Sequence, residues 1–193
     1  MVLIPVKSFS LAKVRLAGAL DATQRAALAR AMAERVVAAA DPLPAWCVCD
    51  DDEVAAWATA HGARIEWTPG LGLNGAVQES LTRRRAAGAT RAIVAHGDLP
   101  FATELASLAD AEDDEVLVVP DRRRSGTNVL SLPTAGGFQV AYGPDSFELH
   151  RREAARCGLR WREVTAEHLG WDVDEPADLD VPAHLGTLPG GPS

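Results

Sequence analysis

The sequence predicts an α/β fold of three layers (αβα), in which helices cover both faces of a mainly parallel, Rossmann-like sheet. Short apolar runs alternate with amphipathic stretches along most of the chain, which is the pattern of strands joined by helical crossovers. A β-rich stretch at 115–142 interrupts this alternation and indicates an antiparallel insertion. With 193 residues, 47% of them hydrophobic, the chain can form one domain with a full core. We expect this domain to span 1–185 and the tail 186–193 to be disordered.

The first half of the chain predicts four strands and three helices. In chain order these are a strand at 2–6, a helix at 21–40, a strand at 46–49, a helix at 52–61, a strand at 63–67, a helix from its cap Asn74 to Gly88, and a strand at 91–96. The last strand is so apolar that we expect it at the centre of the sheet. Asp21 and Gln24 have capping-box spacing in an Ala-rich helix that two prolines end. Gly62 suits the position just after the second helix.

The second half of the chain predicts more strands than helices. In chain order we expect a helix near 102–111, strands at 115–120, 127–133 and 138–142, a helix at 146–158, and strands at 159–165 and 171–174. Because strands follow one another directly between 115 and 142, the antiparallel segment is expected there. Gly158 suits the end of the last helix.

Charge and composition exclude several classes of protein. The chain has 27 acidic and 19 basic residues and a formal net charge of −8, which disfavours a dedicated nucleic-acid binder. No apolar run reaches the roughly 18 residues of a membrane span. Three cysteines make no even disulfide set and lack the spacing of a zinc site. The N-terminus is unlike a signal peptide, so we expect a cytoplasmic protein with no nucleic-acid or membrane partner.

Basic residues follow the first predicted strand. Ligands of open α/β sheets bind at the carboxyl ends of the strands, and there KSFSLAKVRL (7–16) supplies Lys7, Lys13 and Arg15. Such a loop can bind phosphates through lysine charge and backbone N–H groups. The glycine patterns of P-loops and of dinucleotide-binding folds are absent. A solvated basic turn is the alternative, and the loop alone does not decide between the two.

Aspartates follow or end two apolar segments. Asp98 comes after the strand 91–96, and Asp172 and Asp174 share one face of the expected strand 171–174. Carboxylates that lie together repel each other unless a cation separates them. Oxygen-only ligands suit Mg²⁺ or Mn²⁺, which commonly accompany phosphates. The alternatives are a helix N-cap for Asp98 and a polar turn for the other two.

A third candidate region combines an arginine run with a glycine-containing turn. The arginines at 122–124 could bind a carboxylate or a phosphate, although such a run is usually a solvated surface. Thr127, Gly143 and Ser146 could form an anion-binding nest, because glycine permits close backbone approach and Ser146 lies where a helix begins. Ordinary turn and capping chemistry explains the same residues equally well.

Six stretches of the sequence, taken in order, carry a resemblance to a known family. They are IPVKSFSLAKVRL (4–16), PGLGLNGAV (69–77), HGDLP (96–100), PDRRRSGTNVL (120–130), YGPDSF (142–147) and DVDEPADL (172–179). Together they resemble the 2-phospho-L-lactate or phosphoenolpyruvate guanylyltransferases of coenzyme F-420 biosynthesis over about residues 2–180. The resemblance implies a nucleotidyltransferase fold of the nucleotide-diphospho-sugar transferase type, which molybdenum-cofactor guanylyltransferases share.

The resemblance also implies roles for individual residues. The metal-binding aspartates of the family correspond to Asp98, Asp172 and Asp174. The positions that face the nucleotide correspond to Lys7, Lys13, Arg15, Leu73 and Asn74. The positions that hold the phosphorylated acid correspond to Thr127, Gly143 and Ser146. Lys13 and the three aspartates are then the expected catalytic residues, with Mg²⁺ as cofactor and Mn²⁺ as a substitute.

The reaction that the resemblance implies joins GMP from GTP to the phosphate of a three-carbon acid and releases pyrophosphate. The Ala- and Arg-rich composition suits a bacterial source, where the family usually takes phosphoenolpyruvate, so that acid is favoured and 2-phospho-L-lactate comes next. The acceptor phosphate is already ionised, so no strong general base is required. Because the product is an activated phosphate, transient handover to the next enzyme of the pathway is a further hypothesis.

Two positions depart from the family pattern, and other functions stay open. His96 replaces a small residue before the aspartate, and Asp145 stands where glycine is frequent. A nucleotidyltransferase for molybdopterin or a sugar phosphate is less favoured, because the Gly-rich loop after the first strand is absent. A phosphatase of the D-x-D type would carry that motif after the first strand and not near position 172. A non-catalytic nucleotide-binding protein of the same fold is the remaining alternative.

Overall fold

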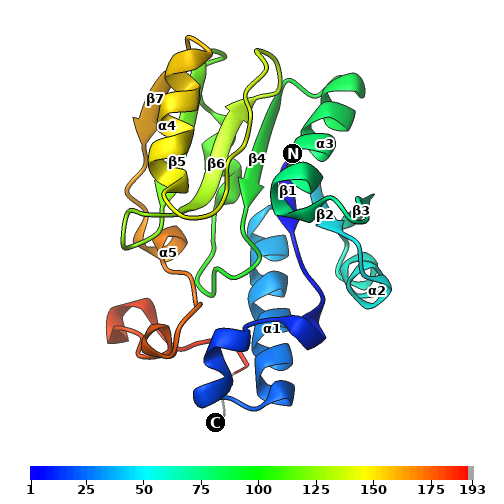
Figure 1. Ribbon diagram of the computed structural model, residues 1–193, viewed down its shortest axis with the longest axis vertical. Coiled ribbons are helices and arrows are strands. Elements are labelled where there is room, and N and C mark those ends of the chain that lie inside the picture. The colour runs from blue at the N-terminus through cyan, green and yellow to red at the C-terminus, as the bar shows by residue number, and fades with distance from the viewer. Residues whose placement is uncertain (191–193) are drawn as a thin grey trace.

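Seven strands form one mixed sheet in the computed structural model, which describes residues 1–190 (Figure 1). The strands are β1 (Val2–Pro5), β2 (Ala45–Cys49), β3 (Arg64–Trp67), β4 (Arg91–Ala95), β5 (Glu115–Pro120), β6 (Thr127–Pro133) and β7 (Arg160–Glu163). Their order across the sheet is β3-β2-β1-β4-β6-β5-β7, so β4 lies at the centre as predicted. Among the described strands only β6 is antiparallel to its neighbours, β4 and β5. The mainly parallel sheet with an antiparallel segment is therefore confirmed.

Helices connect most of the strands. The α-helices are α1 (Ala22–Ala39), α2 (Asp52–Ala60), α3 (Gly72–Ala86), α4 (Ser146–Arg156) and α5 (Glu167–Gly170). Short 3₁₀ turns are η1 (Phe9–Leu11), η2 (Val14–Gly18), η3 (Leu105–Ala109), η4 (Pro176–Leu179) and η5 (Ala183–Leu185). The capping box of Asp21 and Gln24 at the start of α1 is confirmed, because each side chain accepts the other's backbone N–H. No helix in residues 1–190 is long and apolar enough to cross a bilayer.

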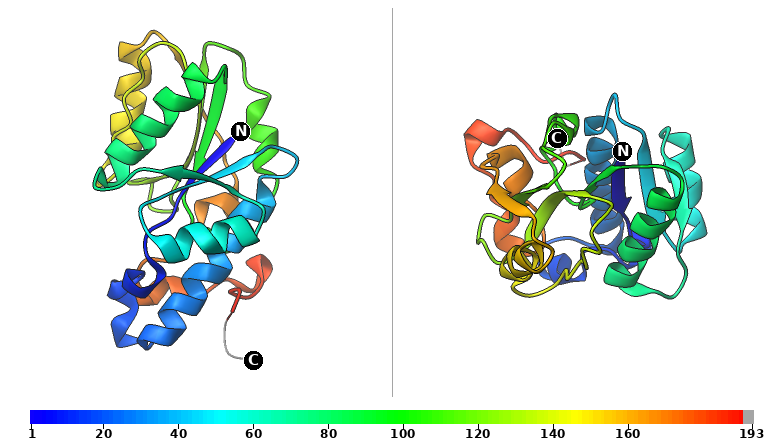
Figure 2. Two further views of the ribbon diagram at one scale, coloured as in Figure 1. Left: turned by 90° about the vertical axis from the view of Figure 1, so that its right-hand side faces the viewer. Right: turned by 90° about the horizontal axis from the view of Figure 1, so that it is seen from above.

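The helices lie on both faces of the sheet, as expected for a three-layer fold (Figure 2). Successive residues of a strand point to opposite faces, so Ile4 belongs to the core between the sheet and the helices α1 and α2. Its neighbour Leu3 belongs to the other core, beneath α3 and α4. Each face buries a continuous apolar layer, which makes the sheet a rigid platform for the loops at its edge.

A third apolar cluster joins the two ends of the chain beside α1. Its buried members are Leu16, Leu28, Met32 and Val173. Figure 1 shows the N-terminal loop (blue) and the C-terminal segment (orange to red) side by side below the sheet. We expected disorder from residue 186 onward. Leu188 packs against this cluster, whereas 191–193 lie outside the described residues.

Two predicted strands are not strands. The segment 138–142 is extended, but it pairs with side chains of α3, because Gln78 and Asn74 accept the N–H groups of Val140 and Tyr142. The segment 171–174 is likewise unpaired with the sheet, and the backbone N–H of Asp174 donates to the Asp178 carboxylate. In both segments a side chain takes the place of a neighbouring strand, which alternation of apolar residues does not reveal.

Two helix predictions also need correction. Near 102–111 only the short turn η3 forms, and Glu104 just before it has a left-handed φ of 54° that interrupts a regular helix. Asn74 does not cap α3, because the helix begins at Gly72 and Leu71 occupies the cap position. The amide of Asn74 is turned to another loop, as described below.

Candidate active site

Loops from distant parts of the sequence meet at one edge of the sheet. The parallel strands β1 and β4 end there, and the loops that follow them face the C-terminal segment 171–180 (Figure 1). Because β6 runs the other way, its first residue, Thr127, lies at the same edge. A cavity of about 460 Å³ opens beside these loops. Ligand sites of open α/β sheets occupy this position.

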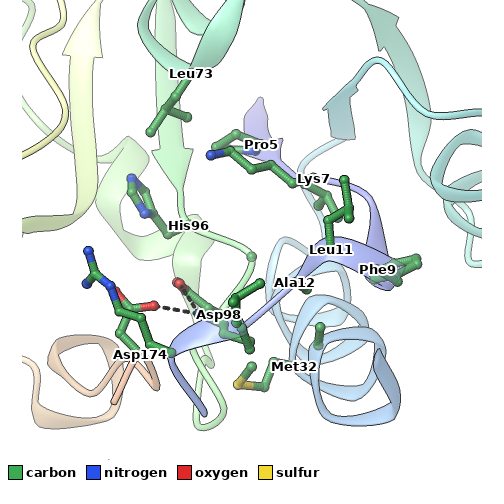
Figure 3. Close-up of a pocket in the computed structure, with 16 residues that line it drawn as sticks. Pro5, Lys7, Phe9, Leu11, Ala12, Met32, Leu73, His96, Asp98 and Asp174 are labelled. Atoms are coloured by element: carbon green, nitrogen blue, oxygen red, sulfur yellow. Dashed lines mark hydrogen bonds and ion pairs between the residues drawn. The ribbon is translucent and has the colours of Figure 1, made fainter. Parts of the chain in front are cut away.

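Lys13 bridges two of the predicted metal-binding aspartates. Its Nζ donates to Oδ2 of Asp98 at 2.7 Å and to Oδ1 of Asp174 at 2.8 Å (Figure 3). Burial opposes the charge of Lys13, but the two carboxylates overcome it and raise the pKa of the ammonium above its ordinary value. Burial also opposes the charge of Asp98, which would raise the pKa of this carboxyl. The positive charge of Lys13 reverses this effect and lowers the pKa below its ordinary value. Lys13 and Asp98 therefore both stay ionised.

The carboxylates outnumber the cation between them. Asp172 is the third aspartate, and burial together with the charges of Asp98 and Asp174 raises its pKa to about 7. One oxygen of Asp98 and one of Asp172 are shielded from solvent without a hydrogen-bond partner in the described part of the chain. Orphaned carboxylate oxygens of this kind suit a hard cation such as Mg²⁺. Within residues 1–190, however, no three acidic, His or Cys side chains converge in metal-ligating geometry, because the ammonium of Lys13 separates two of them.

Four of the five residues assigned to the nucleotide line the cavity. These four are Lys7, Lys13, Arg15 and Leu73. In Figure 3, Leu73 reaches in from the side opposite Asp98 and Asp174, so apolar and charged walls face each other. Asn74 is the exception. Its Nδ2 donates to the carbonyl of Tyr142 at 2.9 Å, and its Oδ1 accepts the N–H of the same residue at 2.6 Å.

The residues assigned to the phosphorylated acid gather next to this cavity without lining it. Gly143 has a φ of 131°, and its carbonyl accepts the N–H of Ser146 at the start of α4. Gly143 is exposed, whereas Thr127 and Ser146 are almost fully buried. Thr127 Oγ1 lies 3.0 Å from Nδ1 of His150 on α4. The start of β6, the turn at Gly143 and the start of α4 thus meet here. The spacing of these residues in the sequence could not show this.

The two departures from the family pattern have defined surroundings. His96 lines the cavity, its ring centroid lies 4.9 Å from that of Tyr142, and burial lowers its pKa. Its Nε2 has no partner among the residues that the structure describes. Asp145 is exposed, caps α4 in a left-handed conformation with a φ of 58°, and makes no side-chain cap bond. The extra carboxylate therefore stands in solvent at the rim of the turn.

The arginine run is paired with carboxylates of the chain itself. Arg122 and Arg123 both donate to the carboxylate of Asp178, and Arg124 pairs with Glu163. Asp178 is fully buried and also accepts the backbone N–H groups of Asp174 and of the residue after it. That the arginines at 122–124 bind a carboxylate or a phosphate therefore stays a prediction. Arg122 and Arg123 hold the segment that carries Asp172 and Asp174 through their ion pairs with Asp178.

Sequence reasoning missed two residues that organise the site. Asp178 could have been found, because E-P-A-D after the aspartate pair has capping-box spacing. His150 could not, because its position in α4 is that of an ordinary inward-facing residue and its partners lie on two other segments.

Comparison with known proteins gives consistent results. A sequence model of the family described as "Guanylyl transferase CofC like" matches residues 1–183. Proteins named phosphoenolpyruvate guanylyltransferase are similar along nearly their whole length. One from Chloroflexus aggregans is 35% identical over 189 residues, covering 91% of this chain and 93% of the relative. One from Rubrobacter xylanophilus is 35% identical over 183 residues, covering 91% and 89%.

Solved structures of nucleotidyltransferase type share the fold. A putative nucleotide-diphospho-sugar transferase from Desulfovibrio desulfuricans G20 superimposes with a TM-score of 0.70 at 16% identity, covering 90% of this chain and 81% of that one. A nucleotidyl transferase from Methanothermobacter thermautotroptrophicus gives a TM-score of 0.61 at 15% identity, covering 92% and 94%. At these identities the likeness concerns the fold alone.

Proposed function

The chain belongs to the CofC-like guanylyl transferase family, and we propose that it joins GMP from GTP to the phosphate of phosphoenolpyruvate and releases pyrophosphate. The observation that carries this proposal is the lysine between carboxylates beside a 460 Å³ cavity at the carboxyl ends of the strands. The relatives named above are phosphoenolpyruvate guanylyltransferases, which supports that acid over 2-phospho-L-lactate. The place of this step in coenzyme F-420 synthesis follows from the same family.

The chemical task is to bring two polyanions together. A phosphate oxygen of the acid attacks the α-phosphorus of GTP, and pyrophosphate leaves on the opposite side. Lys7, Lys13 and Arg15 line the cavity and supply positive charge for the triphosphate. Leu73 provides an apolar wall for the base. The attacking oxygen is already an anion, so these residues orient and neutralise the reactants and need not remove a proton.

The acidic residues have the chemistry to hold Mg²⁺. Asp98, Asp172 and Asp174 offer only oxygen atoms, two of which are buried without a partner. A bound Mg²⁺ would neutralise charge on the phosphates during transfer. Lys13 would then exchange its two carboxylates for phosphate oxygens, since one ammonium and one metal ion compete for the same acidic oxygens. Mn²⁺ has similar ligand preferences and is the expected substitute.

The acid is proposed to bind beside Thr127, Gly143 and Ser146. Ser146 offers a hydroxyl at the first turn of α4, a position that favours anions, and Gly143 a backbone N–H just before it. Thr127 offers a hydroxyl at the start of β6. Handover of the product to a following enzyme and a cytoplasmic location remain part of the proposal.

The test is pyrophosphate release from GTP with Mg²⁺, measured separately with phosphoenolpyruvate, 2-phospho-L-lactate and 3-phosphoglycerate. We expect release with phosphoenolpyruvate, none with ATP in place of GTP, and none in EDTA. Release with another acid alone would reassign the acceptor. Silence with all three acids, in protein that still binds GTP, would reject the proposed reaction.

A further inference from the structure

His150 lies where the three segments of the proposed acid site meet. Its side chain on α4 is completely buried. Nδ1 lies 3.0 Å from Oγ1 of Thr127 on β6, and Nε2 lies 2.9 Å from the backbone nitrogen of Ala141, two residues before Gly143. Ser146 precedes His150 by one helical turn. One imidazole therefore contacts or adjoins every segment that carries an acid-binding candidate.

The hydrogen bonds of His150 fix which ring nitrogen carries the proton. The N–H of Ala141 can only donate, so Nε2 must accept and cannot hold a proton. Burial, followed by the nearby His96, lowers the pKa of His150 to about 4, so the ring is neutral at pH 7. Its single proton is then on Nδ1 and points at Thr127.

This bond determines what the hydroxyl of Thr127 can do. Because Oγ1 accepts from Nδ1–H, the hydroxyl proton of Thr127 remains available as a donor to another group. Phosphate and carboxylate oxygens are acceptors, and they form strong bonds with a donor that is already oriented. The aromatic contacts of the ring, 4.8 Å to Tyr142 and 6.0 Å to Phe138 between centroids, hold it in this orientation.

We propose that His150 is a positioning residue of the acid site, which presents the Thr127 hydroxyl as a hydrogen-bond donor to the phosphorylated three-carbon acid. The inference rests on the proposed function for the identity of the acid, but not for the geometry. It assigns His150 a role in binding the acid and none in binding GTP, because the ring faces β6 and the 138–143 segment and does not line the cavity.

The first test does not depend on activity. Nitrogen-15 NMR of the histidine rings distinguishes a proton on Nδ1 from one on Nε2, and we expect His150 to be the Nδ1–H form at pH 7. A proton on Nε2, or a charged ring, would overturn the inference whatever reaction the protein catalyses. The result also separates this inference from the proposed function, which the pyrophosphate assay tests in the unmodified protein.

The second test uses two substitutions that each keep one half of the contact. The amide of His150→Asn can still donate to Thr127 from the position of Nδ1, whereas that of His150→Gln can still accept from Ala141 at the position of Nε2. We expect the KM for the acid to rise roughly tenfold or more in the Gln variant and to stay within about threefold in the Asn variant. The KM for GTP should stay unchanged in both. His61→Gln, at the C-terminal cap of α2 across the sheet, is the matched control.

A purely structural role predicts a different outcome. Both His150 variants would then lose thermal stability and raise the KM for the acid equally, which would contradict the inference. A double-mutant cycle adds a third criterion. Thr127→Val should raise the acid KM by itself, and adding His150→Gln to it should cause little further rise. Additive effects, or a Thr127→Val variant with normal acid KM, would overturn the proposed pathway through the hydroxyl.

Discussion

Lys13 and its two carboxylates form a charge arrangement that is stable without a ligand. The side chain of Lys13 is 10% exposed, and two short bonds to Asp98 and Asp174 compensate for its burial. Removing one partner leaves a buried charge short of compensation, so substitutions here affect both binding and stability. Asparagine is therefore a better probe than alanine, because it keeps the volume and one acceptor oxygen.

We expect Asp98→Asn to lower kcat by about 100-fold or more while the protein stays folded. The substitution removes the charge that Lys13 and a divalent cation would share. The measurement is pyrophosphate release at saturating GTP and acid, with circular dichroism to verify folding. Asp110→Asn, an exposed aspartate after η3, should behave like the unmodified protein. Near-normal turnover of the Asp98 variant with Mg²⁺ would remove that residue from the catalytic group.

The raised pKa of Asp172 predicts that the folded protein loses stability as the pH rises. The folded protein holds this proton up to about pH 7, whereas the unfolded chain releases it near pH 3.9. The folded state therefore binds the proton more tightly, and the contribution of Asp172 to the free energy of unfolding falls as pH rises from about 4 to 7. Asp172→Asn should remove this fall.

Urea denaturation at pH 5 and pH 8 measures the effect directly. The variant should be more stable than the unmodified protein at pH 8, and the difference should shrink at pH 5. Comparing the two proteins at each pH cancels the titration of His96 and His150, which is common to both. An equal difference at both pH values would mean that Asp172 is not the group with the raised pKa.

At the scale of elements, sequence patterns predicted the strands of the sheet. They did not predict the extended segments whose backbone is hydrogen-bonded to side chains. The apolar runs of β1, β4 and β6 predicted strands within one or two residues, because burial on both faces leaves an unmistakable signature. The extended segments 138–142 and 171–174 carry similar residues. Their backbone partners are side chains from helices and turns, which no local pattern encodes.

Asn74 is one of the side chains that bond to the backbone of these extended segments, and its contacts suggest a test. Both halves of its amide bind the backbone of Tyr142, so Asn74 connects α3 to the loop that leads to Gly143. We expect Asn74→Ala to raise the KM for the acid at least several-fold and the KM for GTP less, because one donor and one acceptor of the loop lose their partner. Asn74→Asp, which keeps the acceptor alone, should be intermediate. A larger effect on GTP would return Asn74 to the nucleotide side.

At the scale of the whole molecule, the site depends on a cluster that joins both ends of the chain. Leu16 lies just after Lys13, and Val173 lies between the two C-terminal aspartates. Both are fully buried in the same cluster beside α1. Packing in this cluster therefore sets the distance between Lys13 and its carboxylate partner.

We expect Leu16→Ala to destabilise the protein by about 2–5 kcal/mol, the usual effect of a cavity in a well-packed core. It should also lower kcat, because the loop that carries Lys13 loses its anchor against Val173. Urea denaturation and the pyrophosphate assay measure the two effects. Leu11→Ala, at a side chain on the same loop that is 73% exposed, should leave stability within about 0.5 kcal/mol of normal.

The residues of the site were largely predictable, whereas their arrangement was not. Lys13, Asp98 and Asp174 follow from a resemblance and from their places after strands, and the structure brings all three together. Only the structure shows that the lysine lies between the carboxylates, because a bond between residues 161 positions apart leaves no pattern in the local sequence. The roles of Asp178 and His150 depend on the same kind of distant contact.

The separation of Lys13 from Asp174 also has a consequence for synthesis. A ribosome makes the lysine near the beginning of translation and its partner 161 residues later. Until the C-terminal segment emerges, the growing polypeptide has Lys13 but lacks Asp172, Asp174 and the Val173 anchor. We therefore expect a chain that ends before this segment to be inactive, because it would lack two of the three candidate aspartates and one anchor of the cluster.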